Sequence, residues 1–271
     1  MLVVFYIFAF VFGCCLGSFL CCQARRLRLK EKGKKSLGKR SVCPFCKHKL
    51  GWYENIPIVS WLIQKGKCRK CGKKIGAAEI LSELFTGLAV LGLTMSSFKT
   101  ADDIASSSFF VWAVFATTLL LILSLIFSAI YDGLYGELPR ICLIFSAICA
   151  IIIAILKLWN FFSVAGEFYW QPILELIGAT MILGGIYLVL YLVSKGKWVG
   201  DGDWILGAII AMALGTPWLA LVTLFVSNFS ACIIMYPKVL KKKNHTIYFG
   251  PFLVFAFILT LILSDYGIIN L

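Results

Sequence analysis

Charged residues are scarce in this chain, and the scarcity excludes a soluble globular protein. Only 14% of the 271 residues are charged, whereas 61% are hydrophobic and the mean hydropathy is +0.92; soluble domains carry about 25% charged residues. In place of charge the chain has apolar runs of about 20 residues, the length that a helix needs to cross roughly 30 Å of hydrocarbon. The pattern predicts an all-α, polytopic membrane helix bundle of about eight spans. The expected spans are residues 2–22, 78–97, 108–131, 141–159, 173–194, 204–215, 218–236 and 249–264.

A basic segment is also missing before the first apolar run, and its absence argues against a secretory signal. The run is longer than the apolar core of a signal peptide, and small residues such as Gly13 and Gly17 favour helix packing over cleavage. We therefore expect residues 1–22 to remain as the first transmembrane span. A loop at 23–77 follows it, and residues 78–271 form the rest of the membrane helix bundle.

Lysine and arginine are concentrated in a few segments, which predict the orientation in the membrane. Of the 26 basic residues, 24 lie in residues 23–76, 140, 195–197 and 238–243. Lys99 and Lys157 are the exceptions. The four segments are alternate loops of an eight-span chain, so the positive-inside rule places them in the cytoplasm and the N-terminus outside. The first of them opens with a basic stretch, 25–40, that we expect to be extended and solvated.

The net charge of +13 comes largely from the same basic loops that predict the orientation. Basic loops at the cytoplasmic face contact anionic lipid headgroups, so we expect membrane lipid, and no nucleic acid, as the partner of this charge. The same loop positions put two acidic residues that end apolar runs, Asp132 and Asp203, on the cytoplasmic side of the membrane.

The loop at 23–77 contains four cysteines in two pairs. Cys43 and Cys46 form one C-x-x-C knuckle, and Cys68 and Cys71 form a second one, followed by a glycine, after twenty-one intervening residues. This spacing predicts a tetrahedral four-thiolate zinc site, which is structural because four protein ligands leave no position for a substrate. The alternatives are two unrelated thiol pairs or disulfides, and a cytoplasmic location disfavours the disulfides.

Two aspartates lie at the ends of apolar runs, where a carboxylate is costly. Asp132 directly follows the run 109–131, and Asp203 directly precedes the run 204–214. Because a charge within or at the edge of a membrane span costs roughly 3 kcal/mol even on mild insertion scales, each is a functional-site hypothesis. Two such groups on one face of the membrane indicate carboxylates that share a proton, as in an aspartyl protease.

The second aspartate belongs to the turn Gly200-Asp201-Gly202-Asp203. Gly200 and Gly202 would let this turn bend sharply and approach an extended substrate closely. Asp203 would lie in the first turn of a helix, whose dipole favours the ionised form, so Asp132 is expected to hold the shared proton more often. Asp201 is the alternative catalyst at this turn, or else the N-cap of the helix.

Two glutamates at the start of the second predicted span also require an explanation. Glu79 and Glu83 are four residues apart and therefore lie on one face of a helix, with Glu83 one turn deeper. Two hypotheses remain open for Glu83. It binds the polar part of a substrate or cofactor, or it pairs with Lys73 or Lys74.

Several short motifs follow one another along the chain, and together they are far more specific than any one alone. They are Gly17-Ser18-Phe19, the two C-x-x-C pairs, Trp52-Tyr53-Glu54-Asn55-Ile56-Pro57 with Ser60-Trp61, Glu83-Leu84 with Thr86-Gly87, Asp132 with Leu138-Pro139, Gly200-x-Gly202-Asp203, and Phe249-Gly250-Pro251-Phe252. In this order the chain resembles bacterial type IV prepilin peptidases, the leader peptidase and N-methyltransferase family, over nearly its whole length. It departs from the family at Ile205, where a lysine is usual, and at Arg140, where an acidic residue is common.

The resemblance implies a function and a set of site residues. Asp132 and Asp203 would be the catalytic pair of a membrane aspartyl endopeptidase, which hydrolyses a peptide bond with water activated between the carboxylates. The substrate would be a prepilin or pseudopilin precursor with a short basic leader, a glycine before the cut and an apolar helix after it. The four cysteines would bind zinc, and S-adenosylmethionine would serve a second activity, methylation of the new N-terminus, for which the chain has no separate sequence fingerprint.

Two other classes of protein are compatible with the same residues. One is a non-enzymatic, membrane-anchored zinc-ribbon protein for binding or assembly, with aspartates that are merely interfacial. The other is a transporter that uses Asp132 and Asp203 for proton coupling. Transporters often contain an inverted repeat, and no convincing duplication relates the two halves of this chain.

Overall fold

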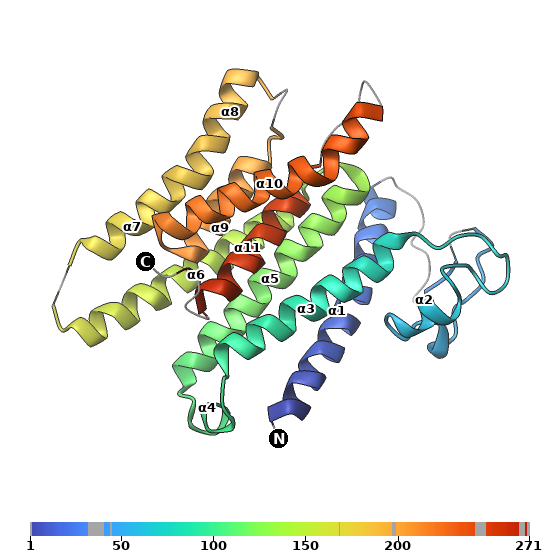
Figure 1. Cartoon of the computed structure of the whole chain (residues 1–271), viewed down its shortest axis with the longest axis horizontal. Coiled ribbons are helices and arrows are strands. Elements are labelled where there is room, and N and C mark those ends of the chain that lie inside the picture. The colour runs from blue at the N-terminus through green and yellow to red at the C-terminus, as the bar shows by residue number, and fades with distance from the viewer. Residues whose placement is uncertain are drawn as a thin grey trace. The chain divides into compact units, whose positions relative to one another are not determined.

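The apolar runs form helices throughout the computed structural model, which describes residues 2–31, 41–43, 45–167, 169–196, 199–241, 248–265 and 269. These residues contain helices and two isolated β-bridges but no strand. The chain divides into two compact units, Met1–Asp103 and Ile104–Leu271. The longer helices, drawn in Figure 1, are α1 Leu2–Glu31, α3 Ala77–Ser97, α5 Phe109–Tyr135, α6 Arg140–Ala165, α7 Gln171–Thr180, α8 Ile186–Ser194, α9 Asp203–Leu214, α10 Pro217–Lys241 and α11 Gly250–Asp265.

The helix lengths confirm a polytopic helical membrane protein. By length and composition six helical segments of the described chain are able to cross a membrane: Leu2–Glu31, Ala77–Ser97, Phe109–Tyr135, Arg140–Ala165, Gln171–Ser194 and Pro217–Met235. The other two predicted spans are also apolar helices, but α9 has 12 residues and α11 has 16. At about 1.5 Å per residue α9 is only about 18 Å long. It is short because Gly215 ends it in the left-handed conformation and Pro217 begins the next helix.

In the first unit, α1 and α3 are antiparallel and pack closely. Gly13 of α1 faces Gly87 of α3, and at one end of the pair the Tyr6 hydroxyl donates to the Phe98 carbonyl over 2.6 Å. At the other end α1 continues to Glu31, well past the predicted end of the first span. The expectation of an extended stretch from residue 25 is therefore wrong for 25–31; residues 32–40 lie outside the described part.

An ion pair explains the extra length of α1. Arg25 Nη1 lies 2.7 Å from Glu79 Oε1 on α3, and Ala24 beside it is fully buried. The part of the helix beyond the predicted span is thus held against the start of α3 by packing and by charge. In the described part of the segment between the two helices the helical elements are short: the 3-10 turn η1 Trp52–Glu54 and α2 Val59–Ile63.

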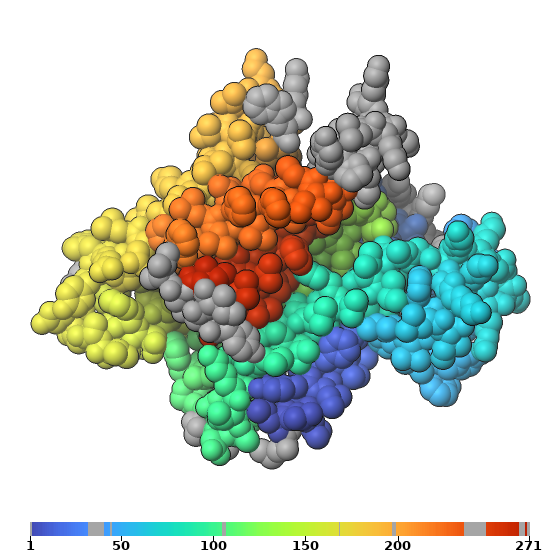
Figure 2. Space-filling view, viewed as in Figure 1, coloured from blue at the N-terminus to red at the C-terminus, as the bar shows by residue number. Residues whose placement is uncertain are grey.

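In the second unit, α11 occupies a central position. It packs against α5, α9 and α10, and Figure 1 shows it between α5 and α10. The side chains of α10 (orange) and α11 (red) meet in Figure 2. The core of this unit consists of fully or almost fully buried aliphatic and aromatic side chains: Leu121, Ile122, Leu125, Ile126, Leu206, Ile210, Leu253, Val254 and Phe257.

Helix α9 is held at its C-terminal end by a lysine. The Lys157 ammonium of α6 donates to the carbonyl oxygens of Ala213 (2.8 Å) and Leu214 (3.3 Å). These carbonyls lack partners within α9, and a cation there is favoured by the helix dipole. The interaction explains why Lys157, one of the two basic residues outside the four basic segments, is present in an apolar helix. It also fixes the helix that carries Asp203 at its other end.

A π-helical turn lies beside α9. The predicted span 173–194 is one continuous helical segment in which η2, Met181–Gly185, interrupts the α-helical pattern between α7 and α8. A Cβ atom added at Gly184 would lie 2.8 Å from the Cβ of Ala208 on α9. The small residues therefore allow a close approach of this segment to α9.

Candidate active site and metal centre

Asp132 lies in the last turn of α5 and is buried, with 6% of its surface exposed. Its carboxylate oxygen Oδ2 accepts a hydrogen bond from the backbone N–H of Gly250 over 3.0 Å. Gly250 is the first residue of α11, 118 positions further along the chain. The free N–H groups at the start of a helix favour a negatively charged partner. The motif Phe249-Gly250-Pro251-Phe252 thus acts directly on Asp132.

Gly250 is the residue type that this contact requires. A Cβ atom built on it would lie 2.8 Å from Oδ2 of Asp132 and 3.4 Å from its Cγ atom. Real Cβ atoms essentially never approach other atoms within 3.0 Å. Any larger residue at this position would therefore displace the Asp132 carboxylate or the start of α11.

Asp203 is the first residue of α9 and is equally buried, at 7% exposure. Its Oδ2 atom accepts the Gly200 N–H over 2.9 Å, and its own N–H donates to the Gly200 carbonyl over 3.2 Å. The two hydrogen bonds close the turn onto the carboxylate. Asp201, in contrast, is exposed, and Gly202 is the N-cap of the helix. The alternative that Asp201 caps α9 is therefore wrong.

The two motif turns touch each other. A Cβ atom at Gly202 would lie 2.6 Å from Cδ1 of Leu138, in the Leu138-Pro139 motif that follows α5. The Asp203 carboxylate is also near enough to Asp132 for a direct coulombic interaction. Two buried carboxylates that come from separate helices and interact in this way can share one proton and activate a water molecule.

A tyrosine that the sequence did not single out lies beside this pair. Tyr187 of α8 is 2% exposed, accepts the side-chain amide of Asn228 over 3.0 Å, and is 3.3 Å from the Ser227 hydroxyl. Its ring centroid is 5.4 Å from that of Phe249, and it is within coulombic range of Asp203. A single tyrosine in an apolar run is common, so no local signal distinguished it.

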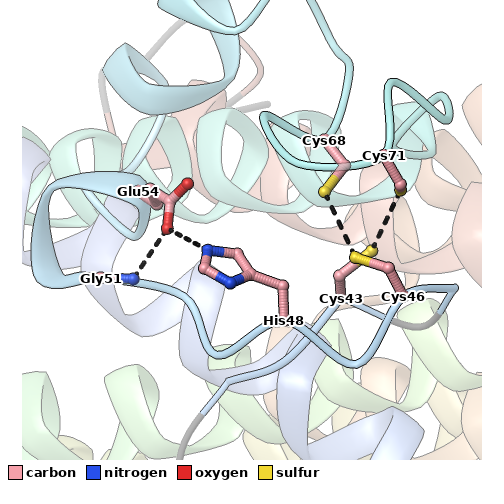
Figure 3. Close-up of polar contacts among 7 residues, drawn as sticks. All are labelled: Cys43, Cys46, His48, Gly51, Glu54, Cys68 and Cys71. Carbon is pink, nitrogen blue, oxygen red and sulfur yellow. Dashed lines mark hydrogen bonds and ion pairs between the residues drawn. The ribbon is translucent and has the colours of Figure 1, made fainter.

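The four cysteines of the loop meet at one point. Cys43 Sγ lies 3.9 Å from Cys71 Sγ, Cys46 Sγ lies 3.9 Å from Cys68 Sγ, and all four sulfurs are within 4.8 Å of one another (Figure 3). Four sulfurs at ~2.3 Å from a tetrahedral ion are about 3.8 Å apart. The geometry therefore fits a metal ion. All eleven cysteines lie in the described part and are free thiols, which excludes the disulfide alternative.

Matching backbone turns present the two pairs of thiols. Lys47 N–H donates to the Cys43 carbonyl over 3.0 Å, and Gly72 N–H donates to the Cys68 carbonyl over 2.8 Å. Hydrogen bonds from the backbone N–H groups of Cys71 and Lys70 lower the pKa of the Cys68 thiol to about 6. A thiol with a lowered pKa is ready to bind a cation as the thiolate.

A histidine and a glutamate contact each other beside the first C-x-x-C pair. Glu54 is buried, and its Oε2 atom accepts the Gly51 N–H over 2.8 Å and lies 3.4 Å from Nε2 of His48 (Figure 3). His48 follows Cys46 by two residues. The Trp52-to-Pro57 motif therefore contributes Glu54 to the interior of the cysteine module, whereas Trp52 itself is 80% exposed.

Glu83 has a different partner from the lysines considered above. Its Oε2 atom accepts the backbone N–H of Ile58 over 2.7 Å, and the residue is 7% exposed. No ion pair to Lys73 or Lys74 forms among the described residues; Lys73 Nζ instead lies 4.8 Å from the centroid of the Phe45 ring. Pairing with these lysines is therefore wrong, and a role toward a ligand is the hypothesis that remains.

Comparison with known proteins agrees with the motif order. Residues 11–97 match the family described as Bacterial Peptidase A24 N-terminal domain. The prepilin leader peptidase/N-methyltransferase of Bacillus subtilis (strain 168) is 30% identical over 213 residues, which are 78% of this chain and 74% of that protein. The protein of the same name from Aeromonas hydrophila is 26% identical over 234 residues, 83% of this chain and 72% of the relative.

A shorter match is closer in sequence. The Myxococcus xanthus (strain DK1622) protein of the same name is 46% identical over 84 residues, which are 31% of this chain and 24% of that relative. No solved structure matches the chain. The Bacillus match is long enough and similar enough to decide the family. The chain belongs to the prepilin leader peptidase/N-methyltransferase family.

Proposed function

We propose that this protein is a membrane aspartyl endopeptidase that removes the leader peptide of type IV prepilins or pseudopilins. The names of the relatives support the substrate class. The observation that carries the mechanism is the pair of buried aspartates, Asp132 and Asp203, each bound through Oδ2 to the backbone N–H of a glycine. Merely interfacial aspartates would be solvated. These two are buried and close enough to interact.

The reaction is hydrolysis by a water molecule between the carboxylates. Both carboxylates accept a backbone N–H at or just before the start of a helix, and we assign the shared proton to Asp132 and the ionised form to Asp203. Asp203 takes a proton from water, and the hydroxide formed attacks the scissile carbonyl carbon. Asp132, which carries the shared proton, donates a hydrogen bond to the carbonyl oxygen as negative charge develops on it. The proton that Asp203 took from water passes to the amine nitrogen when the carbon–nitrogen bond breaks, so the amine leaves neutral and Asp203 is ionised again.

Substitution of Gly250 by alanine is expected to reduce cleavage by roughly 10- to 100-fold, because the added methyl group would displace the Asp132 carboxylate from its catalytic position. Gly133→Ala is the matched control. A Cβ atom there meets only Pro251 Cγ at 3.7 Å, an ordinary contact. Initial rates on a precursor peptide measure both variants. Equal rates for Gly250→Ala and wild type would contradict the role given to the Gly250 N–H.

The cut is made at the cytoplasmic face, with the N-terminus of the enzyme outside. The four basic segments support this orientation, and anionic membrane lipid is the partner of their charge. Nucleic acid is not a partner on this proposal. Residues 23–77 then form a cytoplasmic module, and the helices of 78–271 receive the apolar helix of the precursor.

Reporter tags test the orientation directly. Tags inserted at Lys99 and Asn160 are expected to read outside, whereas tags at Lys35 and Lys242, which lie beyond the described residues, are expected to read inside. Accessibility of each tag to a membrane-impermeant reagent in intact cells is the measurement. A tag at Lys242 that reads outside would contradict the eight-span orientation and put the crossing of the short sixth span, α9, in question.

Zinc is the metal we propose for the cysteine module, held by Cys43, Cys46, Cys68 and Cys71. It is a structural ion: when bound, it cross-links the two knuckles and leaves no ligand position for chemistry. The names of the relatives also support a second activity, N-methylation of the new N-terminus, with S-adenosylmethionine as the methyl donor.

Cleavage by the purified protein tests the main proposal. The full chain is reconstituted in lipid with a synthetic precursor, and the masses of the products identify the bond that is cut. A binding or assembly protein would leave the precursor intact. The same products, incubated with S-adenosylmethionine, gain one methyl group at the new N-terminus if the second activity is present.

A further inference from the structure

A cavity of about 170 Å³ lies within the first unit. The end of α1, the cysteine loop and the start of α3 line it, and it contains an unusual set of charged groups. Three carboxylates and two guanidinium groups face it: Glu54, Glu79, Glu83, Arg25 and Arg26. The proposed peptidase chemistry uses none of these groups.

Two of the three carboxylates already have charged or titratable partners. Glu79 pairs with Arg25 at 2.7 Å, and Glu54 contacts His48 at 3.4 Å. Glu83 differs from both. It is more than nine-tenths buried, yet its one hydrogen-bond partner among the described residues is the neutral N–H of Ile58, and no cation pairs with it there. A buried carboxylate without a counter-charge is costly, unless a cationic ligand supplies the missing partner.

A second unsatisfied group lies in the wall of the same cavity. The indole Nε1 of Trp61 is buried and has no acceptor in the described part of the chain. Trp61 also packs against Gly66, where a Cβ atom would lie 2.9 Å from the ring. The cavity thus offers an acceptor that needs a cation and a donor that needs an acceptor. The ammonium group and first carbonyl oxygen of a peptide N-terminus have these two properties within one residue.

We propose that this cavity binds the N-terminal ammonium group of the cleaved substrate, with Glu83 as its ion-pair partner and the Trp61 N–H bound to the first carbonyl. The inference rests on the proposed methyl transfer. For the transfer, the ammonium group gives one proton to the carboxylate of Glu83, its ion-pair partner. The amine nitrogen then forms a bond to the methyl group of a sulfonium donor. The methyl–sulfur bond breaks with both electrons left on sulfur, which becomes a neutral thioether.

Binding of two synthetic peptides to the full-length, zinc-loaded protein tests the proposal. Both peptides begin at the first residue after the cut, and one has a free amine whereas the other is N-acetylated. Glu83→Gln is expected to weaken binding of the free-amine peptide by roughly 30-fold, because the amide cannot pair with the ammonium. Binding of the acetylated peptide should be the same in wild type and variant.

Three controls keep the result interpretable. Glu31→Gln makes the same chemical change at an exposed position of the first unit, where the side chain is 43% exposed, and should bind both peptides as wild type does. Zinc content and melting temperature of each variant report whether the module has folded. Trp61→Phe keeps an aromatic ring in the cavity wall but removes the N–H. It is expected to weaken the binding of both peptides several-fold.

Several outcomes would overturn the assignment. Equal affinity of Glu83→Gln and wild type for the free-amine peptide would do so. An equal loss of affinity of Glu83→Gln for the free-amine and the acetylated peptide would do so as well. Loss of S-adenosylmethionine binding with unchanged peptide binding would assign Glu83 to the sulfonium instead. Wild-type protein that neither cleaves nor methylates would contradict the proposed function, whereas methylation at the wild-type rate by Glu83→Gln would contradict this inference alone.

Discussion

Replacement of Asp132 or Asp203 by asparagine is expected to lower precursor cleavage by at least roughly 100-fold in each variant, while expression and zinc content stay near wild type. Asparagine has nearly the size of aspartate and can still accept the Gly250 or Gly200 N–H through its side-chain oxygen. It cannot take a proton from water or hold the shared proton. The substitutions should therefore lower the rate of cleavage without disturbing the packing of the protein.

Asp201→Asn is the matched control for this experiment. Asp201 is exposed and precedes the buried Asp203 by two residues, so its substitution should leave substantial cleavage. Initial rates on one precursor peptide compare the three variants. Full cleavage by Asp203→Asn together with loss in Asp201→Asn would show that the wrong aspartate of this turn had been chosen. Cleavage by both Asp132→Asn and Asp203→Asn would remove the aspartyl mechanism altogether.

Loss of the metal is expected to unfold the cysteine module. Among the described residues 41–43 and 45–76 the buried positions are Cys43, Glu54, Gly66 and Cys68, so no aliphatic side chain of these residues forms a core. A module of this kind obtains its folding free energy from the metal. Cys43→Ser or Cys71→Ser should therefore lose the single zinc ion and make the loop sensitive to protease.

Metal analysis and limited proteolysis measure this effect on protein purified without chelator. Cys232→Ser is the control, because Cys232 is an exposed residue of α10 outside the module, and it should retain one zinc ion per chain. Wild-type protein that contains no zinc would contradict the assignment of the metal. A Cys43→Ser variant that is as resistant to protease as wild type would contradict the structural role.

The sequence alone predicted the features that depend on neighbouring residues. Hydrophobicity over about 20 residues decides membrane insertion locally, so all eight apolar runs are helices. A C-x-x-C pair sets its own turn geometry, so the four thiols were predicted to meet. For the same reason Asp203, set in a glycine turn before an apolar run, could be preferred to Asp201 without knowledge of the fold.

Apart from the cysteine cluster, which its motif spacing predicts, tertiary structure alone decided the contacts between distant residues. Helices that are apolar on all sides do not show in their sequence which face meets which partner. Packing alone therefore brings the Gly250 N–H to Asp132 and the Lys157 ammonium to the end of α9. It also gives Glu83 the Ile58 N–H as its partner, and not Lys73 or Lys74. Packing further places Arg25 of the extended α1 beside Glu79 at the start of α3, an ion pair that no local pattern of the sequence contains.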